Sequence, residues 1–240
     1  MELYVGTSGW SYVWNPDGFK WYARSSGLNA VELNASFYRF PFPSQVKGWS
    51  KQGRGLRWAV KVHRSITHFR KMGGRAFETW RKFKKLFEPL DDVIDFYLFQ
   101  LPPSVRASEG VRRRVEVYAE ELGWRLALEP RSLDWFTDEA IEWARELGIT
   151  LVSPDSPEKM FEAYNTSGVV YARLHGRVEW YSYCYTREEI AEVLAKSAAA
   201  KPERIYVFFN NNHDMLHNAR ETLELGRGIG LALPGLPSSR

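Results

Sequence analysis

The feature that most constrains the fold is an alternation of two patterns along the whole chain. Eight short segments alternate apolar and polar side chains with the period of a β-strand, and helical segments separate most of them. The strands are expected at residues 3–7, 31–34, 56–63, 93–101, 125–129, 149–153, 169–175 and 204–209. One strand-and-helix unit takes roughly 30 residues. This pattern predicts a single (β/α)8 TIM-type barrel over residues 1–240, rather than an open doubly wound sheet.

Capping residues mark the expected ends of the helices. Ser108 and Thr137 stand at helix starts, where a hydroxyl can accept a hydrogen bond from a backbone N–H that has no partner in the helix. Thr186 and Glu189 form a capping box. We expect the last helix to end at Gly226. The expected helices cover residues 18–26, 43–52, 75–88, 108–122 and 137–147, with two more starting near residues 186 and 215.

Polar side chains gather where the expected strands end. In residues 169–175 the period of two places Tyr171, Arg173 and His175 on the inward face, and other strands repeat this scheme. A barrel built only for packing would carry branched aliphatic residues there, and in TIM barrels this end holds the functional site. The polar residues expected at this end are Glu32, Asn34, Lys61, His63, Gln100, Glu129, Arg131, Arg173, His175 and Asn210. They predict a site at the barrel mouth.

Small and aromatic residues follow several of the same strands. Gly9 lies in the loop after the first strand, and a glycine lets the backbone approach a ligand closely. The glycines form neither a phosphate loop nor a dinucleotide-binding pattern. We expect Phe37 and Tyr38 to form the rim of the site. The further residues expected to bind substrate are Ser8, Trp10, Tyr12, Phe37, Tyr38, Trp180, Tyr185 and Asn211.

Several short motifs occur in the order that is typical of one known family. They are Gly6 to Tyr12, Val31 to Asn34 with Phe37 and Tyr38, Ala59 to Lys61 with Thr67 and His68, Phe99 to Pro103, Leu128 and Glu129 with Arg131, Arg173 to Gly176, and Phe209 to Asn211. Over nearly its whole length the chain therefore resembles the YecE-like family, also known as domain of unknown function seventy-two. The resemblance implies a TIM-type barrel and implies no reaction, because none is established for that family.

The cations among the expected site residues favour a small anionic substrate, such as a phosphate ester or a carboxylate. Arg131 and Arg173 could bind such a group through two hydrogen bonds each. Glu129 or His175 could then act as general base or acid, with Lys61 as an electrostatic anchor. Lys61 could instead form a Schiff base if its pKa is lowered. The expected catalytic residues are Glu32, Lys61, Glu129 and His175.

A glycoside hydrolase is one alternative. Glu32 and Glu129 would face each other across the mouth, and two carboxyl groups about 5–9.5 Å apart suit glycoside cleavage. However, the large glycosidase clan with a similar fold uses glutamates on strands four and seven. In this chain Gln100 and His175 stand at those strand ends. A polyhydroxylated substrate therefore stays an alternative to an anionic one.

A metal-dependent enzyme is less favoured. Glu32, Glu129, Asp155 and His175 are possible ligands, but no HxH, HExxH or DxD spacing supports a metal site. Nearby cations such as Lys61 would repel a metal ion. Pairing of the two glutamates with the cations is the simpler interpretation. We predict a metal-independent reaction without a cofactor and keep a divalent metal as an alternative.

The charge and aromatic content leave one non-enzymatic alternative. The net charge of +4 and the aromatic residues would suit a barrel that stacks single-stranded nucleic acid on Trp180 and Tyr185.

The chain has one cysteine, Cys184, which excludes an internal disulfide and favours a reducing compartment. No apolar run reaches the ~18 residues of a membrane span, and we see no signal peptide. We expect a cytoplasmic protein without membrane contact, and its oligomeric state stays open.

Overall fold

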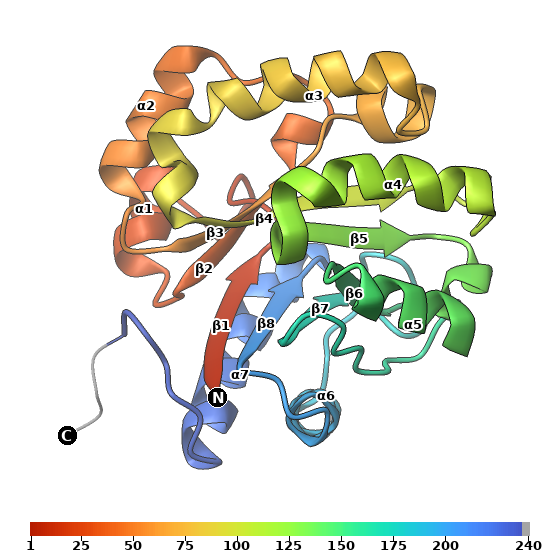
Figure 1. The fold of residues 1–240 in the computed structure, drawn as a ribbon. Coiled ribbons are helices and arrows are strands. Elements are labelled where there is room, and N and C mark those ends of the chain that lie inside the picture. Colours follow the sequence, from red (N-terminus) through yellow and green to blue (C-terminus); the bar gives the residue numbers. More distant parts are fainter. Residues whose placement is uncertain (237–240) are drawn as a thin grey trace.

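The computed structural model describes residues 1–236, which form a nearly closed barrel of eight parallel strands (Figure 1). Neighbouring strands pair in the order β1-β8-β7-β6-β5-β4-β3-β2, so each strand from β2 to β8 lies beside its neighbour in sequence. The strands are β1 (Glu2–Thr7), β2 (Ala30–Leu33), β3 (Arg57–Lys61), β4 (Ile94–Leu101), β5 (Leu126–Pro130), β6 (Thr150–Asp155), β7 (Val169–Leu174) and β8 (Arg204–Phe209). The predicted (β/α)8 TIM-type barrel is confirmed.

Helices surround the barrel, as Figure 1 shows for α3, α4 and α5 on one side. Residues 156–168 join β6 to β7 without a helix. Thr137 and Thr186 cap α5 and α6 as predicted, each accepting a bond from a backbone N–H at 3.3 Å. The prediction for Gly226 is wrong, because α7 continues through it. The α-helices are α1 (Gly18–Ser25), α2 (Pro43–Gln52), α3 (Gly74–Leu86), α4 (Glu109–Leu122), α5 (Asp138–Glu146), α6 (Arg187–Ala199) and α7 (Met215–Gly228).

Gly226 is needed for packing rather than for ending the helix. A Cβ atom at this position would lie 2.3 Å from Cδ2 of Leu3 on β1. The missing side chain therefore lets α7 approach the outer face of β1 closely. No helix within residues 1–236 is long and apolar enough to cross a membrane.

Side chains fill the interior of the barrel below the carboxyl ends of its strands. The inward positions of β1, β4, β7 and β8 carry aromatic residues, while those of β2, β3 and β5 carry the alanines that leave room for them. The rings of Tyr4 and Tyr206 stack at 4.7 Å. Asp95 accepts a bond from the Tyr206 hydroxyl at 2.6 Å and pairs with Arg57. Because this end is packed, only the carboxyl ends of the strands can receive a ligand.

The barrel closes between β1 and β2 with little backbone pairing. One parallel bridge joins Ser8 to Glu32, and the Gly9 N–H donates to the carbonyl of Glu32 at 2.8 Å. Gly6 permits this contact, because a Cβ atom there would lie 2.5 Å from the carbonyl oxygen of Ala30. We call this junction the β1–β2 seam.

Side chains replace the missing backbone bonds along the β1–β2 seam. The Asn29 carboxamide donates to the carbonyl of Leu3 at 2.9 Å and accepts from the N–H of Val5 at 2.8 Å. The Tyr22 hydroxyl accepts from a β1 N–H at 3.1 Å and donates to a β2 carbonyl at 2.9 Å. Both side chains are buried, so they satisfy backbone groups that water cannot reach.

Candidate functional site at the barrel mouth

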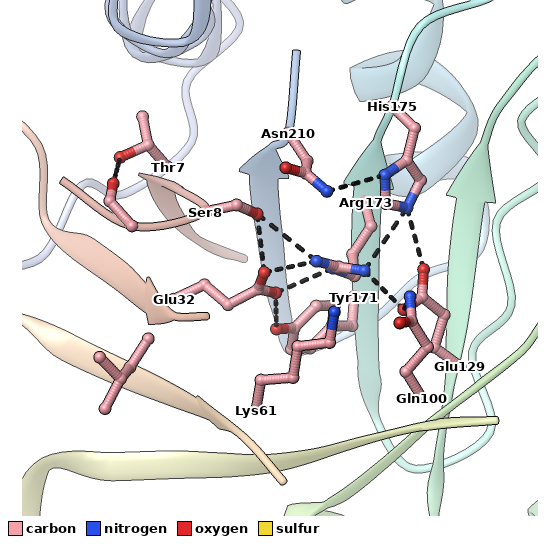
Figure 2. A network of polar contacts seen from close by, with 12 residues as sticks. Thr7, Ser8, Glu32, Lys61, Gln100, Glu129, Tyr171, Arg173, His175 and Asn210 are labelled. Atoms are coloured by element: carbon pink, nitrogen blue, oxygen red, sulfur yellow. Dashed lines mark hydrogen bonds and ion pairs between the residues drawn. The ribbon is translucent and has the colours of Figure 1, made fainter. Parts of the chain in front are cut away.

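Arg173 lies at the centre of the barrel mouth, between two glutamates (Figure 2). Its Nε and Nη2 atoms donate to the Glu32 carboxylate at 2.9 and 2.6 Å, and its Nη1 atom donates to Glu129 at 2.5 Å. β7, β2 and β5 supply these three side chains, and none is exposed to solvent. The simpler interpretation of the sequence, in which the two glutamates pair with cations, therefore describes this arrangement.

Further hydrogen bonds fix the Glu32 carboxylate. The Ser8 hydroxyl donates to one oxygen at 2.7 Å, and the Tyr171 hydroxyl donates to the other at 2.7 Å. Tyr171 was not among the site residues expected from the sequence. The available signal was its position two residues before Arg173, on the same inward face of β7.

Glu129 is surrounded even more completely. Gln100 donates to it at 2.7 Å, the Nε2 atom of His175 lies 2.9 Å away, and Arg131 lies 3.4 Å away. Burial alone would raise the pKa of Glu129, but the charges of Arg131 and Arg173 and the bond from His175 hold it well below its usual range. Glu129 is therefore ionised at neutral pH.

His175 is held between Glu129 and Asn210. The Asn210 amide nitrogen lies 3.1 Å from Nδ1 of His175, so Nδ1 acts as the acceptor and Nε2 carries the hydrogen directed at Glu129. Burial, together with the charge of Arg131, lowers the pKa of His175 to about 3. The imidazole is therefore neutral, and both of its nitrogens are engaged within the protein.

Lys61 differs from these residues. Its side chain is largely buried, yet its amine forms no hydrogen bond or ion pair with another residue of the described chain. The amine lies 4.4 Å from the centre of the Phe37 ring, and Figure 2 shows it directed toward the group around Arg173. Burial, assisted by the charge of Arg173, lowers the pKa of Lys61 to about 7. A substantial part of the amine is therefore neutral at physiological pH.

Arg131, directly after β5, and Trp180, in the loop after β7, contact each other at the mouth. The Arg131 guanidinium lies 4.6 Å above the centre of the Trp180 ring, and this ring also lies 5.4 Å from that of His175. The side chain of Arg131 keeps 15% of its surface exposed, whereas that of Arg173 is fully buried. We call the charged residues of the mouth, Glu32, Lys61, Glu129, Arg131 and Arg173, the ring of charges. Arg131 is the arginine of this ring of charges that solvent can reach.

Phe37 and Tyr38 lie at the rim, as expected. Phe37 is nearly buried beside Lys61, and Tyr38 is 64% exposed. His63 is not part of the ring, because β3 ends at Lys61 and the alternation does not continue to residue 63. The His63 ring instead contacts Phe40 at 4.8 Å, and its Nδ1 atom lies 2.7 Å from the hydroxyl of Ser65.

Three other expected residues lie away from the ring of charges. β2 ends at Leu33, and Asn34 has helical backbone angles that turn its side chain elsewhere. Tyr185 is buried, and its hydroxyl accepts a bond from the Gly176 N–H at 2.8 Å. Asn211 is buried and donates to Asn218 at 2.8 Å. Tyr185 and Asn211 thus support the loops around the mouth.

A side cavity adjoins the ring of charges and has a volume of about 420 Å³. It contains four of the residues expected to bind substrate, which are Ser8, Trp10, Tyr12 and Asn34. Its remaining walls are Gly9, Ser11, Leu33, Ala35, Gln45 and Trp49. Ser8 links the two regions, because it lines the cavity and also donates to Glu32. Most of the expected substrate-binding residues therefore fall into two neighbouring groups, and His63, Tyr185 and Asn211 lie outside both.

The possible metal ligands do not form a metal site. Within residues 1–236, no three histidine, cysteine, aspartate or glutamate side chains are grouped so that they could hold a metal ion. Asp155 instead pairs with Arg177 at 2.9 Å, as Glu32 and Glu129 pair with Arg173. Each carboxylate that could bind a metal is thus already paired with an arginine.

Comparison with known proteins identifies the fold and one family. The model of the family described as protein of unknown function DUF72 matches residues 4–235. The crystal structure of a DUF72 family protein from Thermotoga maritima is 28% identical, covers 95% of this chain and 99% of that one, and superimposes with a TM-score of 0.79. A DUF72 family protein from Enterococcus faecalis is 21% identical and covers 99% of both chains, with a TM-score of 0.82.

A more distant structure shares the fold alone. It is described as a xylose isomerase-like TIM barrel/4-hydroxyphenylpyruvate dioxygenase fusion protein, with 13% identity and a TM-score of 0.58. The match covers all of this chain and 46% of that one. Among curated proteins, none matches the chain.

Proposed function

The chain belongs to the DUF72 family, whose description names no reaction, and we propose that it is an enzyme acting on a small anionic substrate at the barrel mouth. The substrate would be a phosphate ester or a carboxylate. Lys61 would accept a proton from it, as in an isomerase or lyase, and Arg131 would bind the anionic group. No step of this proposal requires a metal or another cofactor.

The observation that carries the proposal is the state of Lys61. Every other charged group of the ring is engaged by an opposite charge or by several hydrogen bonds, but the Lys61 amine has neither. An amine with a pKa of about 7 can accept a proton at physiological pH, whereas an ordinary lysine is almost wholly protonated. Strongly shifted pKa values of this kind cluster at functional sites.

Arg131 supports the anionic character of the substrate. Its contact with Glu129, at 3.4 Å, is the longest of the ion pairs around that carboxylate, and part of its side chain is exposed. Arg173 is less suited to bind substrate, because Glu32 and Glu129 already engage its Nε, Nη1 and Nη2 atoms. The Trp180 ring beneath Arg131 would hold the guanidinium in place.

We assign Glu129 and His175 to positioning rather than to proton transfer. The low pKa of Glu129 makes it a poor acid, and both nitrogens of His175 already have partners. The same geometry disfavours the glycosidase alternative, since Arg173 lies between Glu32 and Glu129 where a sugar would bind. Nucleic-acid stacking on Trp180 and Tyr185 is also disfavoured, because Tyr185 is buried.

The proposal is tested by turnover of a panel of phosphorylated and carboxylated metabolites, followed by NMR. We expect at least one compound to be converted by the wild type and about 100-fold more slowly by Lys61→Met. Lys51→Met, which removes an exposed lysine of α2, should have no effect. A variant Lys61→Met with unchanged turnover would overturn the assignment of Lys61.

Anion binding is tested separately with inorganic phosphate. Phosphate should raise the melting temperature of the wild type and of Arg113→Gln, whose arginine is exposed on α4. It should not do so for Arg131→Gln. Equal stabilisation of Arg131→Gln and the wild type would contradict the role of Arg131.

A further inference from the structure

The walls of the side cavity are uncharged and partly aromatic, in contrast to the charged surface of the protein. None of its ten lining residues is charged, and three of them are the aromatic residues Trp10, Tyr12 and Trp49. Its volume of about 420 Å³ lies within the range of small-molecule sites. The ring of charges and the side cavity are therefore chemically different, although Ser8 belongs to both.

One side chain of the cavity wall, Asn34, carries a polar atom that the described chain does not satisfy. The Oδ1 atom of Asn34 is buried and has no hydrogen-bond partner within the described chain. Such an atom destabilises the folded protein, and native structures contain few of them. A hydroxylated ligand would satisfy this carboxamide once the amide group turns its Oδ1 atom toward the cavity.

Other polar groups of the cavity are held in defined orientations. The Gln45 side chain accepts a bond from the Phe42 N–H at 2.9 Å, which orients its carboxamide at the start of α2. The Tyr12 hydroxyl donates to the carbonyl of Ser8 at 3.2 Å. The cavity thus has two carboxamides, from Asn34 and Gln45, next to aromatic rings. Convergent polar groups of this kind orient a ligand in an otherwise apolar pocket.

The arrangement of the rings indicates which ligand fits. Trp10 and Trp49 meet at 77°, and Tyr12 stacks on Trp14 at 12°, so one face of Tyr12 is already covered. The three aromatic walls therefore do not form a parallel slot that would hold a flat base on both faces. They suit a ring that packs its C–H groups on one aromatic surface and directs hydroxyl groups sideways.

We propose that the side cavity is a binding site for a neutral hydroxylated ring of the carbohydrate type, with the Asn34 carboxamide forming a hydrogen bond with one of its hydroxyl groups. This inference goes beyond the proposed function, since it concerns a second site with its own ligand chemistry. It does not depend on the reaction at Lys61, because binding can be measured without turnover.

Asn34 gives the proposal a distinctive test. Its side chain makes no hydrogen bond within the described chain, so Asn34→Leu removes the unsatisfied oxygen without breaking an existing contact. The variant should melt at the same temperature as the wild type or higher. Its affinity for the sugar should nevertheless fall about tenfold. A residue needed only for folding would not show this combination.

The experiment uses the full chain with glucose, galactose, mannose and ribose as probes, and with adenosine and uridine for comparison. Saturation-transfer NMR reports binding, and tryptophan fluorescence provides a titration, since Trp10 and Trp49 line the cavity. Gln52→Leu is the matched control, because Gln52 is an exposed amide at the far end of α2.

We expect at least one of the sugars to bind the wild type and Gln52→Leu equally, and Asn34→Leu more weakly. Three outcomes would overturn the proposal. They are the absence of sugar binding at millimolar concentrations, binding of the nucleosides alone, and sugar binding that Asn34→Leu leaves unchanged.

Discussion

Ser8 and Glu32 are joined twice across the β1–β2 seam. Their backbones form the parallel bridge at which the barrel closes, and the Ser8 hydroxyl donates to the Glu32 carboxylate at 2.7 Å. The same carboxylate is one of the two that hold Arg173 at the centre of the mouth. Closure of the barrel and the geometry of the site therefore depend on the same pair of residues.

The first prediction concerns Gly6, which allows β1 to approach β2. In Gly6→Ala the new Cβ atom would lie 2.5 Å from the carbonyl oxygen of Ala30, so the backbone at the seam must move. We expect the free energy of unfolding, measured by urea denaturation, to fall by about 2–3 kcal/mol. Gly55→Ala is the control, since its Cβ atom would meet no atom within 4 Å. Equal losses in both variants would contradict the role of the seam.

The second prediction concerns Arg173→Met, which leaves Glu32 and Glu129 buried without their shared cation. We expect a loss of about 3–5 kcal/mol at neutral pH, because the buried Glu32 loses its ion pair and Glu129 keeps only the longer contact with Arg131, at 3.4 Å. Loss of the Arg173 charge should raise the folded-state pKa of Glu129 from well below its usual range toward that range, since Arg131 still lies beside it.

A carboxyl group with a lowered folded-state pKa stabilises the protein above its unfolded-state pKa, about 4.3, and loses that effect as the pH falls. The wild type should lose more of this stabilisation on acidification, so Arg173→Met should be closer to it in stability at pH 3 than at pH 7. Urea denaturation at both pH values measures this, with Arg113→Met as the control for losing an exposed arginine. A deficit that does not change with pH would show that the glutamates are not the cause.

The inward faces of the strands were the part of the site most accessible to sequence reasoning. The period of two on β7 placed Arg173 and His175 in the barrel, and both lie there. Beyond the end of a strand the rule is no longer dependable: it holds for His175, one residue past β7, but fails after β2 and β3. β2 ends at Leu33 and β3 at Lys61, so Asn34 and His63 follow different backbone geometry from the strands before them.

The contacts between side chains could not be derived from the pattern. The sequence places Lys61, Arg131 and Arg173 at the same mouth, but only the structure distinguishes their states. Arg173 is saturated by two glutamates, Arg131 is partly exposed, and Lys61 lacks a charged partner within bonding distance. These differences depend on distances of a few ångströms between β2, β3, β5 and β7, which local sequence does not encode.

The third prediction concerns Lys61 and the pH dependence of stability. Burial lowers its folded-state pKa to about 7 from 10.5, so the unfolded chain binds more protons between these pH values. The cost of the buried amine is therefore largest below pH 7 and declines as the pH rises. The stability advantage of Lys61→Met over the wild type should shrink by about 3 kcal/mol from pH 6 to pH 9.

Urea denaturation across this pH range measures the advantage, and Lys51→Met controls for the loss of a lysine. A direct measurement is also available. In protein labelled with 13C-lysine, one Cε resonance should titrate near pH 7 and should be missing from Lys61→Met. If no lysine titrates below pH 9, the assigned state of Lys61 is incorrect.

The fourth prediction concerns the tautomer of His175. Because Asn210 donates to Nδ1 and burial lowers the pKa to about 3, the ring should stay neutral from pH 5 to pH 8 with its hydrogen on Nε2. In Asn210→Asp a carboxylate beside Nδ1 would favour the imidazolium, and the pKa of His175 should rise by about 2 units. Long-range 15N–1H spectra report both states, and His175→Gln identifies the resonances. Asn212→Asp, which places the same charge two residues away, should leave the titration of His175 nearly unchanged; an equal shift in both variants would show that Asn210 does not select the tautomer.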